Sequence, residues 1–479
     1  MKSSLPIYRN SIDWDQLYQD YPLPDVFAKT VFLQSADEIR QLQNKRFLKT
    51  IERGWNNKFY SKRWHDAGLG RDDIQSLDDI TKIPTYTSDD VKNSLSDNPP
   101  FGDFHDLSEK DFLTTPFKVQ TSGGTTGKPR PTLSDPQSWE IQALTGARAL
   151  YIQGARPGDV MQIPMTCSLA NAPWLAYKAC HDYLGVMPIT SGSGVVTSSR
   201  QQVEIALQMR TNLWQSFPEY LLRIAQYARD EMKQDVRELN TKFLRTYLGP
   251  DLEGTLRKQL EDVWGCRVYD AYGTNEIAAA AFECQERNGL HFMEDTVYLE
   301  VIDVDTGLPV KDGQRGNLVA TAFFRNTPPI IRYNLRDLAR VLSTQQCACG
   351  SHFRRMDHLL GRSDAMVKIK GVNIYPMACL SGVKSDPRTT GEWICVVDKN
   401  KTSLVAMDEL TVHVEIKKNT DSIEGLQHKL EARFKEDLGI AVVVNLVEEG
   451  SLDDLANTGG KEGKARRLLD NRYQNQSKD

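Results

Sequence analysis

The sequence has few cysteines, no long apolar run and little net charge, and each shortage excludes a class of protein. Eight cysteines in 479 residues are too sparse for a disulfide scaffold, so reduced thiols are expected. No uninterrupted apolar run approaches the about 18 residues that span a bilayer, and the N-terminus lacks the apolar core of a signal peptide. A formal net charge of −5 disfavours a protein that coats nucleic acid or an anionic membrane. We therefore expect a cytoplasmic protein with no nucleic-acid or membrane partner.

The composition is that of a folded chain with more than one domain. Hydrophobic residues make up 40% and charged residues 26%, so a packed interior is available and wholesale disorder is excluded. At about 150 residues per domain, this length suggests roughly three units, or two unequal units if one is a large α/β domain. The sequence contains no convincing internal repeat and no low-complexity segment.

The order of apolar and polar residues predicts a large α/β part. Residues 14–110 show helical spacing, and from about residue 110 to 340 short β-rich runs alternate with amphipathic helices. This alternation indicates βαβ units around a mostly parallel sheet. The expected elements are strands at 160–163, 213–214, 267–269, 297–304 and 316–324, the last two paired, and helices at 199–209 and 218–232.

After about residue 361 the pattern changes to that of a small α+β unit. Residues 411–416 and 441–446 are typical of strands. Between them a helical stripe, which Gly439 can terminate, consists of Ile423, Leu426, Leu430 and Phe434. We expect a large N-terminal domain over residues 1–361 and a small C-terminal domain over 362–479, with a frayed tail from Arg472.

The sharpest local feature is the segment from Gln120 to Pro129, Gln-Thr-Ser-Gly-Gly-Thr-Thr-Gly-Lys-Pro. Its glycines let the backbone approach a phosphate closely, and its hydroxyls and lysine supply donors and positive charge. It departs from the phosphate loop of mononucleotide ATPases, because Ser122 replaces the first glycine and Pro129 follows the lysine where a Ser or Thr should bind magnesium. A kinase or P-loop ATPase is therefore disfavoured. The alternative is a flexible surface turn rich in Gly and Thr.

The segment from Thr121 to Pro129 resembles the Ser/Thr-Gly-rich loop of the adenylate-forming enzymes, and the chain is similar to their phenylacetate-CoA ligase branch. Further segments resemble that family's motifs and follow in the family's order: 269–276 (Tyr-Asp-Ala-Tyr-Gly-Thr-Asn-Glu), 329–337, 361–364 with 370–376, and 463–467. The resemblance covers residues 117–470. It implies an adenylate-forming fold, with a large N-terminal domain and a small mobile C-terminal domain.

The resemblance implies ATP-dependent activation of a carboxylic acid as acyl-AMP, with release of pyrophosphate, and then acyl transfer to the thiol of coenzyme A. A mainly apolar pocket would suit an aryl, arylalkyl or cyclic acid. Transfer to the amine of an amino acid, as in coronafacic-acid-type ligases, or to a carrier protein stays open, as does a homodimer. An inactive nucleotide-binding scaffold is the non-enzymatic alternative. This alternative is disfavoured because the chain retains the charged residues that the chemistry needs, Lys128, Glu276, Asp337 and Lys464.

The resemblance also implies roles for residues of the nucleotide site. Glu276 would hold Mg²⁺, Asp337 would accept hydrogen bonds from the ribose hydroxyls with Arg362 near them, and Lys464 would neutralise charge between the carboxylate and the α-phosphate. The phosphates would be cradled by Thr121, Ser122, Gly123, Gly124, Thr125, Thr126, Gly127 and Lys128. The adenine or the α-phosphate would lie beside Tyr272, Gly273 and Thr274. Asp364 would be the hinge about which the small domain rotates between the two half-reactions.

Family position also suggests a wall for the acid and shows departures from the family pattern. The wall would consist of Cys167, Leu169, Leu248, Gly249 and Ala271. Asn275 replaces the usual hydroxyl residue before Glu276, Pro250-Asp251 stands where a small residue and Glu are frequent, and Leu335-Arg336 replaces the usual Thr-Gly before Asp337. Because of these departures, the resemblance does not determine which acid is bound or what accepts the acyl group.

Three cysteines and a histidine have the spacing of a metal site. Cys284, His291, Cys347 and Cys349 form C-x₆-H followed by C-x-C. Two thiolates one residue apart favour a metal over a disulfide, and the other two ligands complete a tetrahedral set with no open position, so the site should be structural. The resemblance implies zinc here. His352 and His358 are competing ligands, and four reduced side chains without metal are the alternative.

Overall fold

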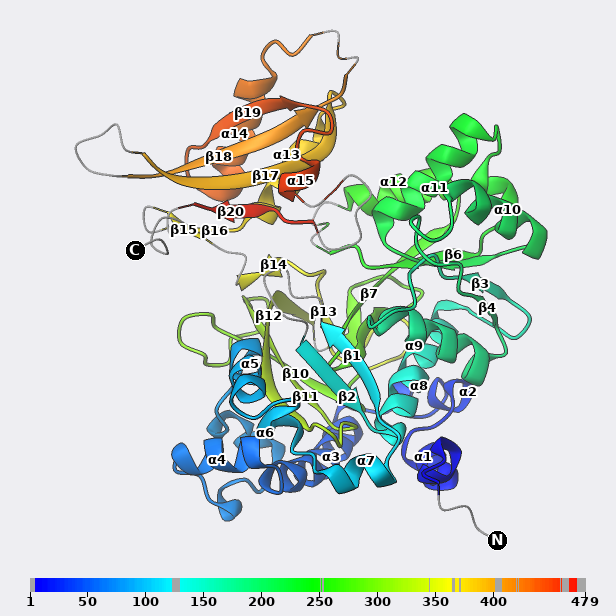
Figure 1. The fold of residues 1–479 in the computed structure, drawn as a ribbon, viewed down its shortest axis with the longest axis vertical. Helices are drawn as coiled ribbons and strands as arrows, with labels where there is room; N and C mark the ends of the chain where they lie inside the picture. Colours follow the sequence, from blue (N-terminus) through cyan, green and yellow to red (C-terminus); the bar gives the residue numbers. More distant parts are fainter. Residues whose placement is uncertain are drawn as a thin grey trace. The chain divides into compact units, whose positions relative to one another are not determined.

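In the computed structural model the described residues are 5–122, 130–249, 251, 254–343, 345–363, 367–369, 372–400, 407–418, 420, 422–456, 458 and 465–471. They belong to two compact units (Figure 1). Unit 1 comprises residues 1–248 and 259–358, and unit 2 comprises residues 249–258 and 359–479. The mixed α/β class expected from the sequence, with a large sheet and a separate C-terminal part, is confirmed.

Helices make up the N-terminal part of unit 1, drawn in blue in Figure 1. The longest is α3 (Ala36–Trp55), which begins at a capping box in which Ser35 and Glu38 bond each other's backbone N–H groups. It buries Ile39, Phe47 and Ile51 at helical spacing. The other helices here are α1 (Trp14–Asp20), α2 (Pro24–Phe27), α4 (Lys58–Asp66), α5 (Ser88–Asp97), α6 (Gly102–His105) and α7 (Glu109–Thr114), with 3-10 turns at Tyr8–Ser11, Val31–Leu33, Arg71–Asp73 and Leu77–Lys82.

One large sheet forms the core of unit 1, in the order β10-β11-β12-β13-β9-β8-β7-β6-β5-β3-β4. Its strands are β3 (Val160–Gln162), β4 (Met187–Ile189), β5 (Leu213–Gln215), β6 (Phe243–Thr246), β7 (Arg267–Thr274), β8 (Ala278–Glu283), β9 (Leu290–Phe292), β10 (Val297–Ile302), β11 (Arg315–Ala322), β12 (Ile330–Ser343) and β13 (Arg355–Met356). The pairs from β4 to β7 are parallel, as expected. From β7 to β10 every pair is antiparallel, so the parallel arrangement covers only part of the sheet.

Helices connect the parallel strands, as βαβ units require. They are α9 (Ala172–Lys178) with the π-helical turn Ala179–Leu184, α10 (Ser199–Met209), α11 (Pro218–Glu231) with the 3-10 turn Val236–Leu239, and α12 (Thr255–Trp264). Another helix, α8 (Pro136–Gln153), precedes the first of these strands. Helix α8 is buried along nearly its whole length. It starts at the Asp135 cap and ends at Gly154, whose φ of +117° lies in a region that favours glycine.

A separate two-stranded ribbon carries the two ends of the Gly/Thr-rich segment. Strand β1 (Lys118–Ser122) pairs antiparallel with β2 (Arg130–Ser134), so that Thr121 lies opposite Pro131 and Ser122 opposite Arg130. The buried Arg325 holds β2 by donating to the Ser134 hydroxyl and to the Leu133 carbonyl, both at 2.6 Å. The connecting residues 123–129 lie outside the described part of the chain.

Unit 2 has its own four-stranded sheet in the order β19-β18-β17-β20. The strands of that sheet are β17 (Thr389–Asn400), β18 (Met407–Ile416), β19 (Val443–Glu448) and β20 (Leu468–Asp470). Unit 2 also contains β14 (Gly361–Arg362) and the two-stranded pair of β15 (Val367–Ile369) and β16 (Val372–Ile374). Its helices are the 3-10 turn Pro376–Ala378, α13 (Cys379–Ser385), α14 (Leu426–Leu438) and α15 (Asp453–Ala456). Leu426, Leu430 and Phe434 of α14 are buried as predicted. The expectation for Ile423 is wrong: it precedes the Gly425 cap, lies outside the helix and is 47% exposed.

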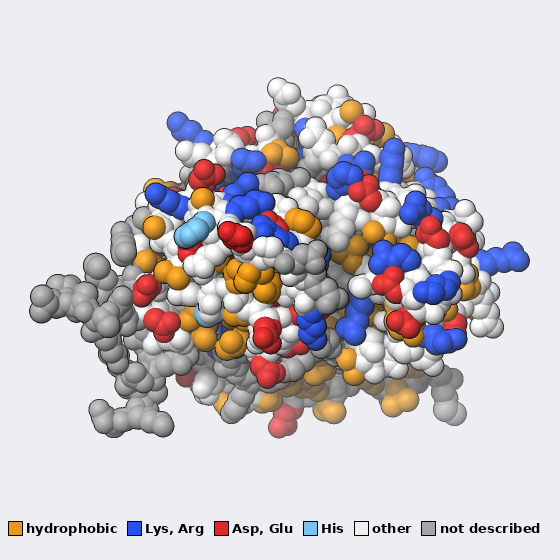
Figure 2. Space-filling view, turned by 90° about the horizontal axis from the view of Figure 1, so that it is seen from above, with side chains coloured by type: hydrophobic (Ala, Val, Ile, Leu, Met, Phe, Trp, Pro, Cys, Tyr) orange, Lys and Arg blue, Asp and Glu red, His pale blue; other side chains and the backbone are white. Residues whose placement is uncertain are grey.

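Two surface properties can be compared with the composition. Among the described residues, none of the helices combines the length and the apolar character that crossing a membrane needs. On the face seen in Figure 2, Lys and Arg side chains are interspersed with Asp and Glu. This mixture agrees with the near balance of 59 basic and 64 acidic residues.

Candidate functional site

The turn between β7 and β8 carries the segment Tyr272 to Glu276. A β-carbon at Gly273 would lie 2.0 Å from the Ala278 carbonyl oxygen, far inside van der Waals contact, so only glycine fits there. The pairing register of β7 and β8 shifts between Tyr272 and Gly273, which bends the strand at this point. The Glu276 N–H donates to the Thr274 hydroxyl at 3.3 Å. These constraints fix the position of Glu276 at the end of the turn.

Both described ends of the Gly/Thr-rich segment contact this turn. The Gln120 side-chain amide donates to the Asn275 carbonyl at 3.1 Å, and the Asn275 amide donates to the Thr121 carbonyl at 2.8 Å. On the other end, Arg130 Nη2 lies 2.6 Å from Glu276 Oε1. The ribbon is therefore tied to the turn from both sides. The predicted phosphate-binding residues Gly123, Gly124, Thr125, Thr126, Gly127 and Lys128 lie outside the described residues, as does any account of the Ser122 side chain.

The ion pair between Arg130 and Glu276 is buried, with side chains only 11% and 7% exposed. Burial by itself would lower the pKa of Arg130, but attraction to Glu276 and Tyr333 outweighs it, and the pKa is raised. Sequence reasoning missed Arg130. Its only signal is that a basic residue follows directly after the Lys-Pro end of the segment.

Asp337 joins the same group of residues through Tyr272. The Tyr272 hydroxyl donates to Asp337 Oδ2 at 2.8 Å, and both residues are buried. The preceding Arg336 has a φ of +59°, in the left-handed region where a side chain costs free energy and glycine does not. This agrees with the glycine that the resembling family usually has there. Arg336 is held by an ion pair with Asp89 at 2.8 Å.

A second cation that the sequence did not single out, Lys118, lies on β1 beside Gln120. Its ammonium donates to Gln120 and Asn171, both at 2.9 Å, and lies 5.0 Å from the centre of the Trp139 ring. Burial, with a smaller contribution from Arg325, lowers the pKa of Lys118 to about 8. Because Gln120 also bonds the Asn275 carbonyl, Lys118 is connected to the turn through one side chain.

The residues predicted to line the acid pocket have contacts of their own in unit 1. Leu169 is 52% exposed, and its carbonyl accepts from the Thr121 N–H at 3.0 Å. Leu248 and Ala271 are buried, and both donate their backbone N–H to Asp270 Oδ1 at 2.9 Å. Cys167 is half-buried. The pocket stays a prediction.

The remaining predicted residues belong to unit 2 or lie outside the described residues. Gly249, with a φ of +65°, and the half-buried Arg362 of β14 are part of unit 2. Asp364, the predicted hinge, and Lys464, the predicted catalytic lysine, are not among the described residues. Their roles stay predictions.

The four predicted metal ligands come together in unit 1. One ligand atom from each of Cys284, His291, Cys347 and Cys349 lies within 4.8 Å of the others. The Cys284 and Cys347 sulfurs are 3.9 Å apart, and the Cys349 sulfur is 3.6 Å from His291 Nε2. Tetrahedral zinc bonds of about 2.3 Å to sulfur and 2.0–2.1 Å to nitrogen place such atoms about 3.8 and 3.6 Å apart. The set therefore fits a zinc ion.

The surroundings of this cluster are also those of a metal site. The Phe353 carbonyl lies 3.2 Å from His291 Nδ1, so it can hold the ring with Nε2 facing the sulfurs. Hydrogen bonds from Cys349 and His291 lower the pKa of the Cys284 thiol despite its burial. His358, which the sequence leaves as a competing ligand, instead contacts Asp270 at 2.8 Å.

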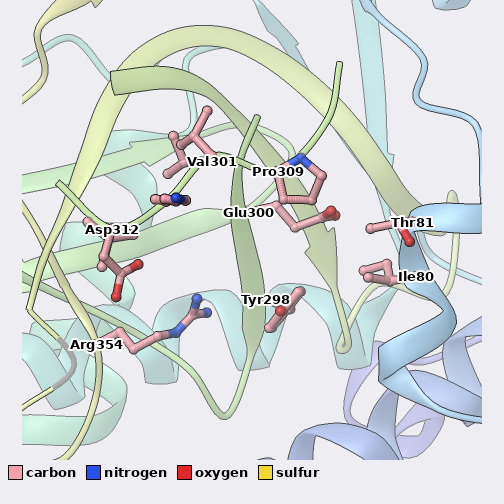
Figure 3. Close-up of a pocket in the computed structure, with 11 residues that line it drawn as sticks. Ile80, Thr81, Tyr298, Glu300, Val301, Pro309, Asp312 and Arg354 are labelled. Atoms are coloured by element: carbon pink, nitrogen blue, oxygen red, sulfur yellow. The ribbon is translucent and has the colours of Figure 1, made fainter. Parts of the chain in front are cut away.

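A cavity of about 150 Å³ lies elsewhere in unit 1 (Figure 3). In this view Arg354 lies between Asp312 and Tyr298, and its guanidinium is 5.1 Å from the Tyr298 ring centre. Glu300 is paired with Arg332 at 2.9 Å. The cavity includes none of the residues that the sequence singles out, so we do not assign the candidate site to it.

Comparisons with known proteins agree with the geometry. Residues 371–472 match the family described as AMP-binding enzyme C-terminal domain. The chain is 30% identical over 456 residues to phenylacetate-coenzyme A ligase of Aromatoleum evansii, covering 91% of this chain and 96% of that protein. It is 28% identical over 450 residues to the protein of the same name from Escherichia coli (strain K12), covering 91% and 95%.

Solved structures are similar over nearly the same length. One is 2-hydroxyisobutyryl-CoA ligase in the postadenylation state with 2-HIB-AMP, with a TM-score of 0.80, 26% identity and coverage of 92% of this chain and 91% of that chain. Another is the same ligase with 2-HIB-AMP and CoA in the thioesterification state, with a TM-score of 0.66, 27% identity and coverage of 92% and 91%.

Proposed function

The chain belongs to the phenylacetate-CoA ligase branch of the adenylate-forming enzymes, and from this membership we propose that it activates a carboxylic acid with ATP. The acid becomes an acyl-AMP, pyrophosphate is released, and the acyl group passes to the thiol of coenzyme A. The acid would be an aryl, arylalkyl or cyclic acid. The relatives whose names state an acceptor are coenzyme A ligases, which favours a thioester product over an amide or a loaded carrier protein.

One observation carries this proposal. Both ends of the Gly/Thr-rich segment contact the turn that holds Glu276, and Tyr272 of the same turn contacts Asp337. Segments far apart in the sequence thus lie next to one another, and they are those to which we assign phosphate binding, magnesium binding and ribose binding. That is the combination that binding of a magnesium-bound nucleotide requires.

The residues would act on the first half-reaction as follows. Glu276 would hold Mg²⁺, which would supply positive charge beside the phosphates, and Asp337 would accept hydrogen bonds from the two ribose hydroxyls. An oxygen of the substrate carboxylate attacks the α-phosphorus, and the bond to the oxygen that leaves with pyrophosphate breaks. Lys128 and Lys464 would stabilise the charge that develops on the phosphates and between carboxylate and α-phosphate.

Arg130 would have a role that the sequence did not suggest. Its guanidinium is paired with Glu276, so it would orient that carboxylate before the metal binds. In the second half-reaction the sulfur of coenzyme A attacks the acyl carbon and AMP leaves. The small domain would rotate about Asp364 between the two steps.

The Cys₃His cluster would hold a structural zinc ion. Cys284 follows β8 and His291 lies on β9, whereas Cys347 and Cys349 follow β12. The ion would thus join the chain after Glu276 to the chain after Asp337. Because all four positions are filled by protein ligands, the ion would brace the nucleotide site and take no part in the reaction.

The test is product analysis with a panel of acids. The purified chain is supplied with Mg²⁺, ATP, arylalkyl, aryl or alicyclic acids, and either coenzyme A or amino acids, and products are identified by mass. We expect an acyl-CoA thioester, AMP and pyrophosphate with a subset of the acids. An amide formed without coenzyme A would overturn the acceptor, and no acid-dependent pyrophosphate with any acid would overturn the activation.

A further inference from the structure

A second cavity in unit 1, of about 320 Å³, lies where the end of α1, helix α3 and the start of α8 meet. Its size falls in the range of about 300–1,000 Å³ that is usual for small-molecule sites. None of its lining residues is among those placed in the nucleotide site or in the metal cluster. Whatever this cavity binds, it is distinct from the proposed reaction centre.

Helix α3 lines the cavity with positive charge. Lys45, Arg46, Lys49 and Arg53 all face it, and Asp20 is the one carboxylate among its lining residues. Lys45, Lys49 and Arg53 are spaced four residues apart and so lie along one side of the helix. Like charges at this spacing repel one another and destabilise a helix. A cavity lined by one sign of charge attracts ligands of the opposite sign.

Three of these cations have no carboxylate partner among the described residues. Arg46 forms an ion pair with Asp295, whereas Lys45 and Lys49 are exposed and form no ion pair with any residue that the structure describes. Arg53 donates one hydrogen bond, to the Phe323 carbonyl at 2.9 Å. Burial lowers the pKa of Arg53, and the weaker opposing attractions come from Tyr21 and Asp135. An anion in the cavity would offset this cost of burying the guanidinium.

The cavity also holds an unsatisfied polar atom and an apolar wall. Gln34 Oε1 is buried and has no hydrogen-bond partner within the described part of the chain, which is uncommon because buried polar atoms are nearly always paired. The amide can turn to present either its oxygen or its NH₂ group to a ligand. Phe323, Phe324 and Ile141 also line the cavity, each only 1–2% exposed, so they offer a small apolar area beside the cations. A ligand that fits both features has an anionic group and an apolar part.

We propose that this cavity binds a small organic phosphate, with the phosphate held by Lys45, Lys49 and Arg53 and the organic part packed against Phe323 and Phe324. A phosphate monoester carries a charge of about −1.5 to −2 at neutral pH and three acceptor oxygens. It therefore matches three cations that lack a carboxylate partner among the described residues better than a single carboxylate does. The inference does not depend on the proposed acid activation.

The experiment measures binding of phenyl phosphate to the full chain by calorimetry. The variant is Lys45→Glu/Lys49→Glu, and the matched control is Lys62→Glu/Lys110→Glu, which changes the net charge equally at exposed lysines outside the cavity. We expect the dissociation constant to rise at least about tenfold in the cavity variant and less than about twofold in the control. Because all four lysines are exposed, thermal unfolding should show that both variants fold.

Other outcomes would overturn the proposal. These are no binding to the unaltered chain, an equal loss in both variants, or a loss in Lys128→Ala with none in the cavity variant, which would place the phosphate at the Gly/Thr-rich segment. Inorganic phosphate should bind at least about fivefold more weakly than phenyl phosphate, because it lacks the apolar part. Equal binding of the two would refute the organic ligand. Acid-dependent pyrophosphate release in the cavity variant tests the proposed function separately.

Discussion

Replacing Arg130 with methionine should destabilise unit 1, because it leaves the Glu276 carboxylate buried without its counter-ion. The two side chains are 11% and 7% exposed and 2.6 Å apart. Removing one partner of a buried pair costs about 3–5 kcal/mol, and since neither side chain is fully buried we expect about 3 kcal/mol. The variant Arg130→Met/Glu276→Gln leaves no unpaired charge in this pair. Its loss in free energy of unfolding should therefore be about 2 kcal/mol smaller than the sum of the losses of Arg130→Met and Glu276→Gln.

Urea unfolding followed by tryptophan fluorescence measures this effect. Of the eight tryptophans only Trp393 lies in unit 2, so the signal reports mainly on unit 1. Adding Mg²⁺ and ATP should recover part of the loss in Arg130→Met, because the metal supplies the missing positive charge, and less of it in the double variant. Losses that simply add, or an Arg130→Met variant as stable as the parent chain, would refute the reasoning.

Three further predictions concern single side chains. Asp337→Asn should raise the KM for ATP about 10- to 100-fold with kcat nearly unchanged, because hydrogen bonds to a charged group are worth about 1.5–3 kcal/mol. Tyr272→Phe should raise the KM less. An unchanged KM in steady-state kinetics would contradict the ribose role of Asp337. Elemental analysis should find about one zinc per chain. Cys349→Ser should lose the zinc and unfold at a lower temperature, whereas Cys266→Ser, which lies outside the cluster, should keep it. A stable chain without metal would refute the zinc site. Burial lowers the pKa of His105 to about 4. The unfolded chain therefore takes up a proton at this histidine at a higher pH than the folded chain does, and the free energy of unfolding should fall by up to about 3 kcal/mol as the pH drops from about 6.5 to about 4. His105→Asn should flatten this pH dependence in unfolding curves, and an unchanged slope would contradict it.

Elements whose ends are encoded locally could be predicted from the sequence. Helix α10 spans Ser199–Met209 as expected, because Ser198 and Gln201 form a capping box at its start and Arg210 takes up a left-handed conformation at its end. The stripe of α14 was right for its buried members and wrong for Ile423, because the glycine at 425 starts the helix only after it. Apolar spacing finds the buried face of a helix but does not show where the helix begins.

Pairings between distant segments could not be predicted in the same way. The strands in the antiparallel half of the large sheet are as apolar as those in the parallel half. Local sequence patterns therefore do not predict which strands become neighbours. Arg130 and Glu276 are 146 residues apart, so no spacing rule connects them. Lys118 likewise depends on Asn171 and Trp139. The metal ligands were easier to find, because Cys and His at short spacing are uncommon unless they bind metal or react.

Exchange of labelled pyrophosphate into ATP tests the central claim most directly, because it needs only the first half-reaction and no acceptor. With Mg²⁺ and an aryl, arylalkyl or cyclic acid, the chain should catalyse exchange that stops when the acid is omitted. The rate should fall by orders of magnitude in Lys464→Ala and stay close to normal in the neighbouring Lys461→Ala. Absence of acid-dependent exchange across the whole panel, with a correctly folded protein, would contradict the account.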